Sequence, residues 1–268
     1  GEVGGLTAAF DSGFHYDASV ATGTGEEAQI RKGATWTDAQ LMLSVGGGLL
    51  KNITDTVTTI KAPNVKGNNI ELVAGTAIGS VDTVPIDLSA GLDTLTTAQK
   101  AALAAAERGD ATVSGNVITI RQPKAVNVAT GSTGALTATA SDGHAYIGSE
   151  QDLRINRVTA TEDIRIKAAG SLINAVAGSG AVNVTGGSLI LESANGGIGA
   201  IPDPVTGALS APLRISLHPD ASLIARAAGD IWIETPDGLT VDTVYSRSDV
   251  KLDAEGSILD IGSDSPTA

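Results

Sequence analysis

The sequence predicts an all-β chain that folds as a right-handed parallel β-helix (solenoid) with one short inserted α-helix. Three observations support this prediction: a phrase that repeats, short alternating strands joined by tight corners, and a composition poor in aromatic residues. The phrase is DIRIKAAGSLIN at 163–174, whose pattern recurs at 250–258 and at 41–50. Two short alternating apolar runs that meet at a glycine and recur at long intervals are typical of repeat architectures.

Short strands with tight corners follow one another from residue 135 to residue 261. Runs of about four to six residues alternate apolar and polar side chains, and about one to three residues of Gly, Asp, Asn or Ser separate them. Such corners are too short to lead a chain back across a wide sheet. We therefore expect each strand to stack on its counterpart in the preceding circuit, with roughly 24 to 30 residues per circuit. Gly170 and Gly256 fall where a corner needs a positive φ or a close backbone approach.

The period of two along each strand predicts which side chains form the core. Ile164, Ile166 and Leu172 are expected to point inward, as are their equivalents in the other copies. The charged residues of these strands are expected to face water: Arg154, Arg165, Lys167, Glu192 and Lys251.

The composition also favours a thin stack of coils. The chain has 268 residues, of which 42% are hydrophobic, but only two Phe, three Tyr and two Trp stand beside 33 Gly. A spherical core normally uses aromatic side chains to fill irregular space, whereas a regular stack has room mainly for aliphatic ones. The main rival is an antiparallel sandwich, whose hairpins favour Asn-Gly or Asp-Gly pairs. Few such pairs fit, namely Asn195-Gly196, Asp142-Gly143 and Asp237-Gly238.

The charge and the absence of cysteine exclude several classes of partner and site. A formal net charge of −13 argues against nucleic acid and against anionic membranes, because both require a basic face. Without cysteine, neither a disulfide framework nor a thiolate metal site can form. No apolar run approaches the ~18 residues of a membrane span, so membrane insertion is not expected.

The repeat phrases divide the chain into an irregular N-terminal coil at 1–29 and β-helix repeats at 30–268, with an insertion at about 89–132. The order of phrases is kept across the copies, with VPIDL at 84–88 corresponding to PLRISL at 212–217. Within the insertion we expect a helix at about 97–108. Thr96 and Gln99 make a capping box, and Gly109 sits where a left-handed residue would follow the helix.

Four phrases of the chain are similar to a known family: DIRIKAAGSLINA, GNNIELVAGTAIGS, SLIARAAGDIWIE and SDVKLDAEGSILDI. They resemble the haemagglutinin-type repeats of filamentous haemagglutinin-like adhesins, large bacterial surface proteins often exported by two-partner secretion. The resemblance covers roughly residues 30 to 261. It implies a β-helical shaft, secretion to the extracellular cell surface, and contact with a host or neighbouring cell through a glycan or a protein. The secretion domain that such proteins carry at the N-terminus is not visible in the sequence.

Residues for catalysis were sought because right-handed β-helices include polysaccharide lyases and hydrolases, which group carboxylates on one exposed face. Asp242, Asp249 and Asp253 are the candidates, although solvated carboxylates are the favoured interpretation because no aromatic sugar platform accompanies them. The scattered histidines form no zinc-binding pair; they are His15, His144 and His218.

The sequence indicates candidate cofactor ligands and candidate contact residues. Calcium is a minor alternative to the expectation of no cofactor, because both the EF-hand loop and the calcium-binding nonapeptide are missing. Its candidate ligands are Asp142, Asp237, Asp260 and Asp264. Candidate contact residues for a partner are Trp36, Trp232 and Leu103.

We therefore expect a non-enzymatic stalk or filament segment of a secreted bacterial cell-surface adhesin. Its partners would be a cell surface and neighbouring repeats or like subunits. Two alternatives remain open: a carbohydrate-active β-helix enzyme and a self-assembling extracellular filament subunit. The insertion departs from the repeat, and departures carry specific functions more often than the repeat does.

Overall fold

A computed structural model describes residues 63–87, 89, 94–107, 109–176, 180–199 and 211–261. The expectations for 1–29 and for the copy at 41–50 lie outside these residues. The described chain is mostly β with one short helix and divides into two compact units. We call residues 63–80 and 124–261 the repeat unit, and residues 81–123 the insertion unit. The described part contains no helix with the length and apolarity needed to cross a bilayer.

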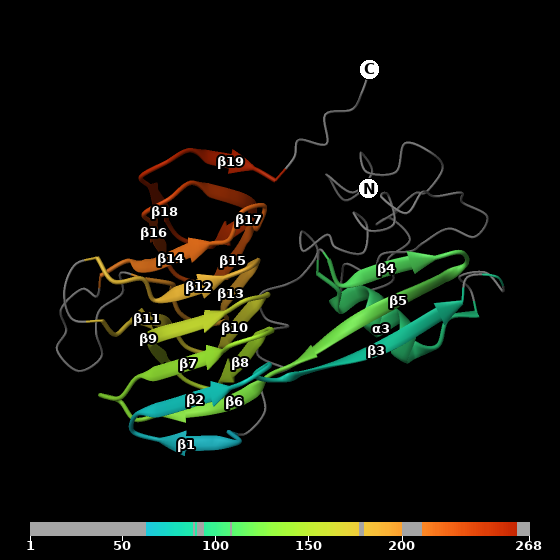
Figure 1. Cartoon of the computed structure of the whole chain (residues 1–268), viewed down its shortest axis with the longest axis horizontal. Helices are drawn as coiled ribbons and strands as arrows, with labels where there is room; N and C mark the ends of the chain where they lie inside the picture. The colour runs from blue at the N-terminus through green and yellow to red at the C-terminus, as the bar shows by residue number, and fades with distance from the viewer. Residues whose placement is uncertain are drawn as a thin grey trace. The chain divides into compact units, whose positions relative to one another are not determined.

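The repeat unit consists of two long sheets in which every strand pair is parallel (Figure 1). The first sheet is ordered β1 (Val65–Gly67), β6 (Val126–Thr130), β8 (Ala145–Ser149), β10 (Ile164–Ala168), β13 (Leu189–Ser193), β15 (Leu223–Ala227), β17 (Leu239–Ser246) and β19 (Ile258–Asp260). The second is ordered β18 (Val250–Ala254), β16 (Ile231–Thr235), β14 (Leu213–Leu217), β12 (Val184–Gly186), β9 (Leu153–Ala160), β7 (Leu136–Ala140) and β2 (Ile70–Ala74), and β11 (Leu172–Asn174) pairs with β9 beside this path. This arrangement is consistent with a parallel β-helix.

The chain alternates between the two sheets, except that the consecutive strands β11 and β12 both pair with β9 of the second sheet. Two strands and two corners thus complete one regular circuit. The regular circuits take 19 residues, the spacing between Ala145 and its partner Ile164 and between Ile231 and its partner Val250. The expectation of roughly 24 to 30 residues was therefore wrong for the regular coils. Corners of very few residues suffice because parallel strands of the same sheet are joined through the other sheet. Other circuits are longer, such as the 34 residues from Leu189 to its partner Leu223.

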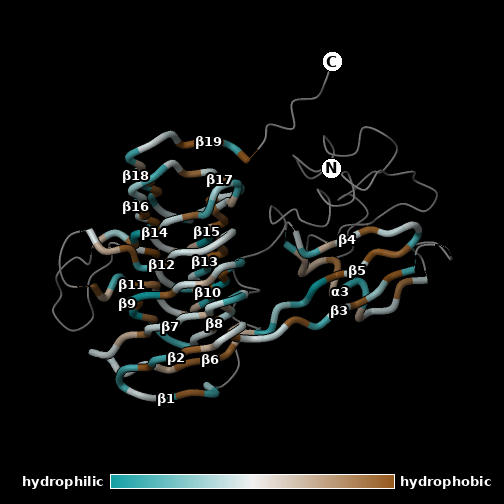
Figure 2. Tube along the Cα trace, in the orientation of Figure 1, coloured by the Kyte–Doolittle hydropathy of each residue, from teal (hydrophilic) through white to brown (hydrophobic). Residues whose placement is uncertain are grey.

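Inward side chains of both sheets form one apolar core. Ile164, Ile166 and Leu172 are fully buried in it, as predicted. Figure 2 shows the alternation of apolar and polar residues along the stacked strands. Because each coil covers the apolar residues of the one before, every added coil extends the same core rather than forming a new one.

The corners bring successive coils into close backbone contact. A Cβ atom on Gly170 would lie 2.3 Å from Asp152 Oδ1 and 2.5 Å from the Asp152 nitrogen. A Cβ atom on Gly256 would lie 2.8 Å from the Gly238 nitrogen. The sequence prediction of corner glycines is confirmed at both positions, and close approach is the reason, since neither has a positive φ.

Asp230 joins two such corners and should make stability depend on pH. Its Oδ1 accepts hydrogen bonds from Ser248 Oγ and from the Asp249 backbone N–H, 19 residues later. The Ser248 bond, and then the Asp249 bond, lower the pKa of Asp230 below its ordinary value of 3.8. A carboxylate with a lowered pKa contributes stability above its unfolded-state pKa, and this contribution is lost as the pH falls through the folded-state pKa.

We expect Asp230→Asn to lower the free energy of unfolding at pH 7 by less than about 1 kcal/mol, because the carboxylate is exposed. The difference in the free energy of unfolding between the variant and the unmodified chain should disappear in acid, below the ordinary pKa of 3.8. Urea unfolding at neutral and acidic pH measures both values. An equal difference in stability at the two pH values would show that the charge of Asp230 does not strengthen its hydrogen bonds to Ser248 and Asp249.

The insertion unit has its own small core under a three-stranded sheet ordered β3 (Ser80–Asp87), β5 (Val117–Lys124) and β4 (Ala111–Ser114). β4 and β5 form an antiparallel hairpin whose turn contains Gly115 at φ 58°. The helix α3 (Thr97–Ala105) contributes Ala102 to a core completed by Ile86, Ala106, Ala111, Ile118 and Ile120. Val84–Asp87 thus belong to this sheet, so their predicted correspondence with the β14 region was wrong.

The predicted helix is confirmed, but it is shorter than expected. Thr96 and Gln99 form the capping box in both directions. The helix ends at Ala105 instead of about 108, because Ala106 turns to an extended conformation. Gly109 does have a positive φ of 84°, but it lies beyond this end and does not cap the helix.

Candidate functional site

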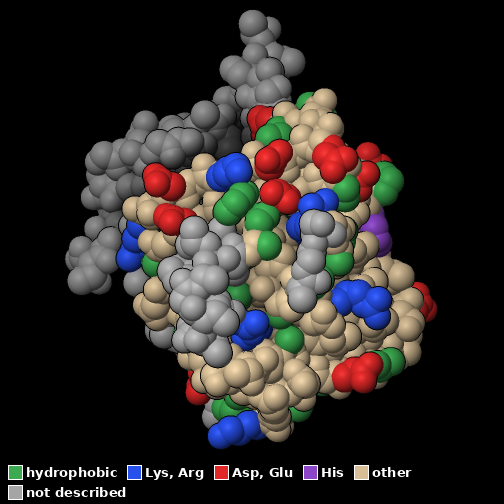
Figure 3. All heavy atoms as spheres, turned by 90° about the vertical axis from the view of Figure 1, so that its left-hand side faces the viewer, with side chains coloured by type: hydrophobic (Ala, Val, Ile, Leu, Met, Phe, Trp, Pro, Cys, Tyr) green, Lys and Arg blue, Asp and Glu red, His purple; other side chains and the backbone are tan. Residues whose placement is uncertain are grey.

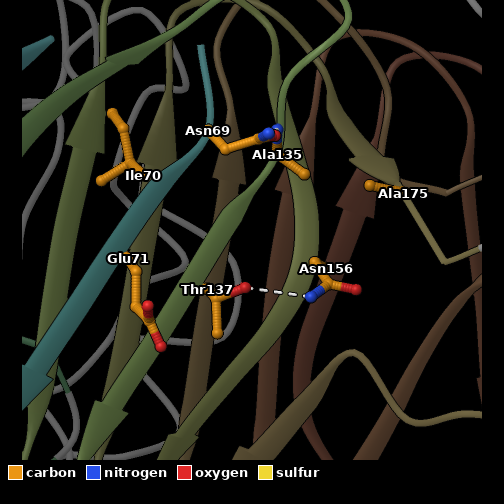
Figure 4. Close-up of a pocket in the computed structure, with 7 residues that line it drawn as sticks. All are labelled: Asn69, Ile70, Glu71, Ala135, Thr137, Asn156 and Ala175. Atoms are coloured by element: carbon orange, nitrogen blue, oxygen red, sulfur yellow. Dashed lines mark hydrogen bonds between the residues drawn. The ribbon is translucent and has the colours of Figure 1, made fainter. Parts of the chain in front are cut away.

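The outer surface of the second sheet contains an open cavity of about 480 Å³, here called the polar groove (Figure 4). It lies over β2, β7 and β9 and is lined by Asn69, Ile70, Glu71, Ala135, Thr137, Asn156 and Ala175. These strands come from distant parts of the sequence. Ile70 pairs with Leu136, which in turn pairs with Ile155 in the following coil.

The strand period and one bulge position the polar side chains of the groove. Leu136 and Ala138 are buried, so Thr137 between them points outward. In β9 the register shifts, and Asn156 is the extra residue of a bulge. Asn156 Nδ2 donates a hydrogen bond of 2.9 Å to Thr137 Oγ1, drawn as the dashed line in Figure 4. Bulges re-aim a side chain in this way at many binding sites.

The chemistry of the groove is that of a hydrogen-bonding surface. Glu71 is exposed and offers carboxylate oxygens. Asn156 commits its amide nitrogen to Thr137, which leaves its carbonyl oxygen as an acceptor. Asn69 Oδ1 accepts a hydrogen bond of 3.0 Å from the Ala135 backbone N–H, which holds the side-chain amide of Asn69 in place. These hydrogen-bonding groups suit ligand hydroxyl or amide groups. Glycoside hydrolysis uses a pair of carboxylates, and Glu71 is the one carboxylate among the lining residues.

The outer surface of the first sheet contains buried charges, contrary to the sequence prediction. Glu192 is fully buried, with one carboxylate oxygen 2.9 Å from Arg226 Nη1 and the other 2.6 Å from Lys167 Nζ. Arg226 is 2% exposed. We call these three residues the ion cluster. Register explains it, because Lys167, Glu192 and Arg226 are directly paired positions of β10, β13 and β15.

A second column of the same sheet surface is also buried. Arg165 is 7% and Tyr146 1% exposed, so the expectation that Arg165 faces water was wrong. The Arg165 guanidinium lies 5.5 Å from the centre of the Tyr146 ring, and His144 stacks on that ring at 4.1 Å. His144 Nδ1 is also 4.0 Å from Glu162 Oε2. Lys251 is exposed, as predicted, whereas Arg154 and Lys167 are half-buried.

The candidate catalytic aspartates are divided between the two sheets. Asp242 is half-buried in β17 of the first sheet and accepts a hydrogen bond from Thr243 Oγ1. Asp253 is exposed in β18 of the second sheet, and Asp249 lies on the corner between the two strands, where its N–H bonds Asp230. The three aspartates therefore do not lie on one sheet, and the contact of Asp249 with Asp230 is made by its backbone.

The candidate calcium ligands lie at separate places. Asp142 is exposed after β7, Asp237 is exposed after β16, and Asp260 is exposed in β19; Asp264 is outside the described residues. Asp237 accepts a hydrogen bond from Ser216 Oγ at 3.2 Å. Among the described residues, no group of three or more acidic or histidine side chains is arranged to hold a metal ion.

The candidate contact residues do not form a common surface. Trp36 and His15 lie outside the described residues. Trp232 is half-buried in β16, and Lys251 Nζ lies 4.1 Å from the centre of its ring. Leu103 is half-buried and packs on the core of the insertion unit. His218 is half-buried in the corner after β14.

Sequence reasoning missed the polar groove altogether. Asn69 and Asn156 are an ordinary turn residue and an ordinary strand residue in the sequence, with no motif around them. The one available signal was the pair of adjacent polar residues Asn156 and Arg157, which interrupts the alternation of β9 and marks a bulge.

Acidic side chains gather on the upper part of the face shown in Figure 3, towards the C-terminal coils. The exposed acidic residues of those coils are Asp237, Asp249, Asp253, Glu255 and Asp260. A face of this sign disfavours anionic partners.

The chain matches no protein-family model, no curated protein and no solved structure.

Proposed function

We propose that the chain is a structural and adhesive segment of a secreted bacterial cell-surface adhesin. The observation that carries the proposal is the pair of all-parallel sheets, joined by a chain whose regular circuits take only 19 residues. Such coils add length at a constant cross-section, which is the mechanical requirement of a shaft. The likeness of four phrases to haemagglutinin-type repeats supports the same function.

The finer architecture in this proposal is a right-handed parallel β-helix. Connections between parallel strands of one sheet are right-handed in about 98% of cases, because right-handed strand twist favours that crossover. Each circuit of the repeat unit is such a connection, passing through the other sheet. The handedness is therefore expected to be the same in every coil.

The adhesive contact is assigned to the polar groove and to a glycan or a protein on the opposing cell. Glu71 and the carbonyl oxygen of Asn156 can accept hydrogen bonds from sugar hydroxyls or from peptide N–H groups. Lacking an aromatic platform among its lining residues, the groove would bind weakly. Several copies of such a weak site held together on one surface still give strong attachment through avidity.

Beads coated with the chain test this function on cultured epithelial cells and on bacterial lawns. We expect the beads to attach, and Asn156→Ala to reduce attachment several-fold because it removes one of the groove's two acceptors and the bond that orients Thr137. Asn195→Ala, the same change at an exposed corner outside the groove, is the matched control. Attachment no better than that of uncoated beads would refute the adhesive function.

The same chain is incubated with a panel of acidic and neutral polysaccharides. Release of reducing ends or unsaturated sugars, abolished by Asp242→Asn or Asp249→Asn, would instead establish a carbohydrate-active enzyme. On our proposal no products form with any of these polysaccharides.

A further inference from the structure

The end of the repeat unit formed by β17, β18 and β19 exposes apolar side chains that elsewhere belong to the core. Val250 is paired with the buried Ile231, and Ile258 with the buried Leu239. These two positions therefore point along the same inward direction as their partners. Yet Val250 is 46% and Ile258 51% exposed. The apolar cross-section of the stack is thus open at this end.

One edge of β18 also has backbone groups directed away from the sheet. The Ile231 N–H donates to the Asp249 carbonyl, and the Glu255 N–H donates to the Thr235 carbonyl. In a parallel ladder alternate residues bond to the same neighbour. The N–H groups of Val250, Leu252 and Ala254 therefore point away from β16, towards the position of a further strand.

Among the described strands, the one at the opposite end of this sheet is β2, and it matches β18 position by position. Both have five residues, and in both the first, third and fifth are apolar and belong to the inward face. In the register that superimposes their first residues, the apolar pairs are Ile70 with Val250, Leu72 with Leu252, and Ala74 with Ala254. In the same register Glu71 faces Lys251, and both side chains are exposed.

Within the repeat unit, ion pairs join oppositely charged residues at directly paired outward positions of neighbouring coils. Lys167 pairs with Glu192, and their charged groups lie 2.6 Å apart. Arg214 pairs with Glu234, and theirs lie 3.2 Å apart. A Glu71–Lys251 pair would continue this rule at a boundary between two molecules.

We propose that the chain associates head to tail, with β2 of a second copy adding as a parallel strand to β18 of the first. The occupant of the open end is thus a second copy of this chain. The contact is heterologous, because two different surfaces meet, so it leaves one end of each kind open and extends into a filament. Strand addition of this kind supplies main-chain hydrogen bonds for affinity and side-chain register for specificity.

Single thiols test the register directly, because the chain has no cysteine. Glu71→Cys and Lys251→Cys are prepared as separate proteins, mixed, and treated with a short bismaleimide cross-linker. Within one molecule β2 and β18 stand at opposite ends of the sheet, about 29 Å apart at ~4.8 Å per strand, so the reagent reports contacts between molecules. We expect covalent dimers in the mixture and none from either variant alone.

The control mixture pairs Lys251→Cys with Arg157→Cys, an exposed position on β9 inside the sheet, and should stay monomeric. Dimers from Lys251→Cys alone would mean that two β18 ends meet. Equal amounts of dimer in the test mixture and in the control mixture would mean that the cross-links form by random collision. Either result overturns the proposal, as does the absence of dimers from the mixture.

Sedimentation velocity over roughly 1 to 100 μM gives an independent readout for a contact in the micromolar range. The unmodified chain should sediment faster as its concentration rises. Lys251→Glu should weaken this association at least several-fold, and adding Glu71→Lys to it should restore the association. A chain that remains monomeric throughout would overturn the proposal. Bead attachment does not require self-association, so this failure would leave the adhesive function intact.

Discussion

Replacing Glu192 by alanine should lower the free energy of unfolding by about 3 to 5 kcal/mol, because it leaves the buried guanidinium of Arg226 without its carboxylate. Arg226 is 2% exposed and Glu192 fully buried, so water cannot take the place of the lost partner. The second contact of Glu192, with Lys167 Nζ at 2.6 Å, is lost at the same time. Urea unfolding followed by circular dichroism measures the change.

Two further variants separate this loss from a general effect of deleting a glutamate. Glu234→Ala removes the ion pair with Arg214, whose side chains are 25% and 21% exposed, and should cost about 0.2 to 1 kcal/mol. Glu192→Ala combined with Arg226→Met should regain part of the stability, because it removes a stranded charge while keeping its volume. Equal losses for Glu192→Ala and Glu234→Ala would contradict the burial of the ion cluster.

Gly199→Ala should lower the free energy of unfolding by about 2 to 4 kcal/mol through backbone strain and overpacking. Gly199 has a φ of 90°, which an L side chain rarely adopts. A Cβ atom there would lie 1.9 Å from the Trp232 carbonyl oxygen. The residue cannot simply move away, because its N–H donates to Leu172 and the neighbouring Ile198 carbonyl accepts from the Trp232 N–H.

Gly75→Ala provides the matched control for this substitution. Gly75 is exposed, its φ is not positive, and nothing lies within 4 Å of an added Cβ atom. Alanine there should leave stability within about 0.5 kcal/mol, or raise it slightly by restricting the unfolded chain. Thermal melting of both variants gives the comparison. A melting temperature of Gly199→Ala as high as that of Gly75→Ala would mean that the coils can separate at the Gly199 corner without loss of stability.

The candidate site was much less predictable than the strands. Thr137 and Asn156 lie in different coils, and their hydrogen bond depends on a bulge that skips one residue of β9. The same applies to Glu192, which looks like any outward strand residue in the sequence. Its two cationic partners follow from the register of three strands, which no local pattern specifies.

The sequence by itself determined the local features of this protein: the strands around Ile164 and Leu172, their inward faces, the close corners at Gly170 and Gly256, and the capping box at Thr96. Each depends on neighbours within a few residues, where side-chain period and backbone sterics act directly. Only the tertiary structure decided the length of the circuit, the separate sheet that contains Val84, and the two cationic partners of Glu192. These depend on which strands lie side by side, and long-range register is set by the packing of the whole stack rather than by any one segment.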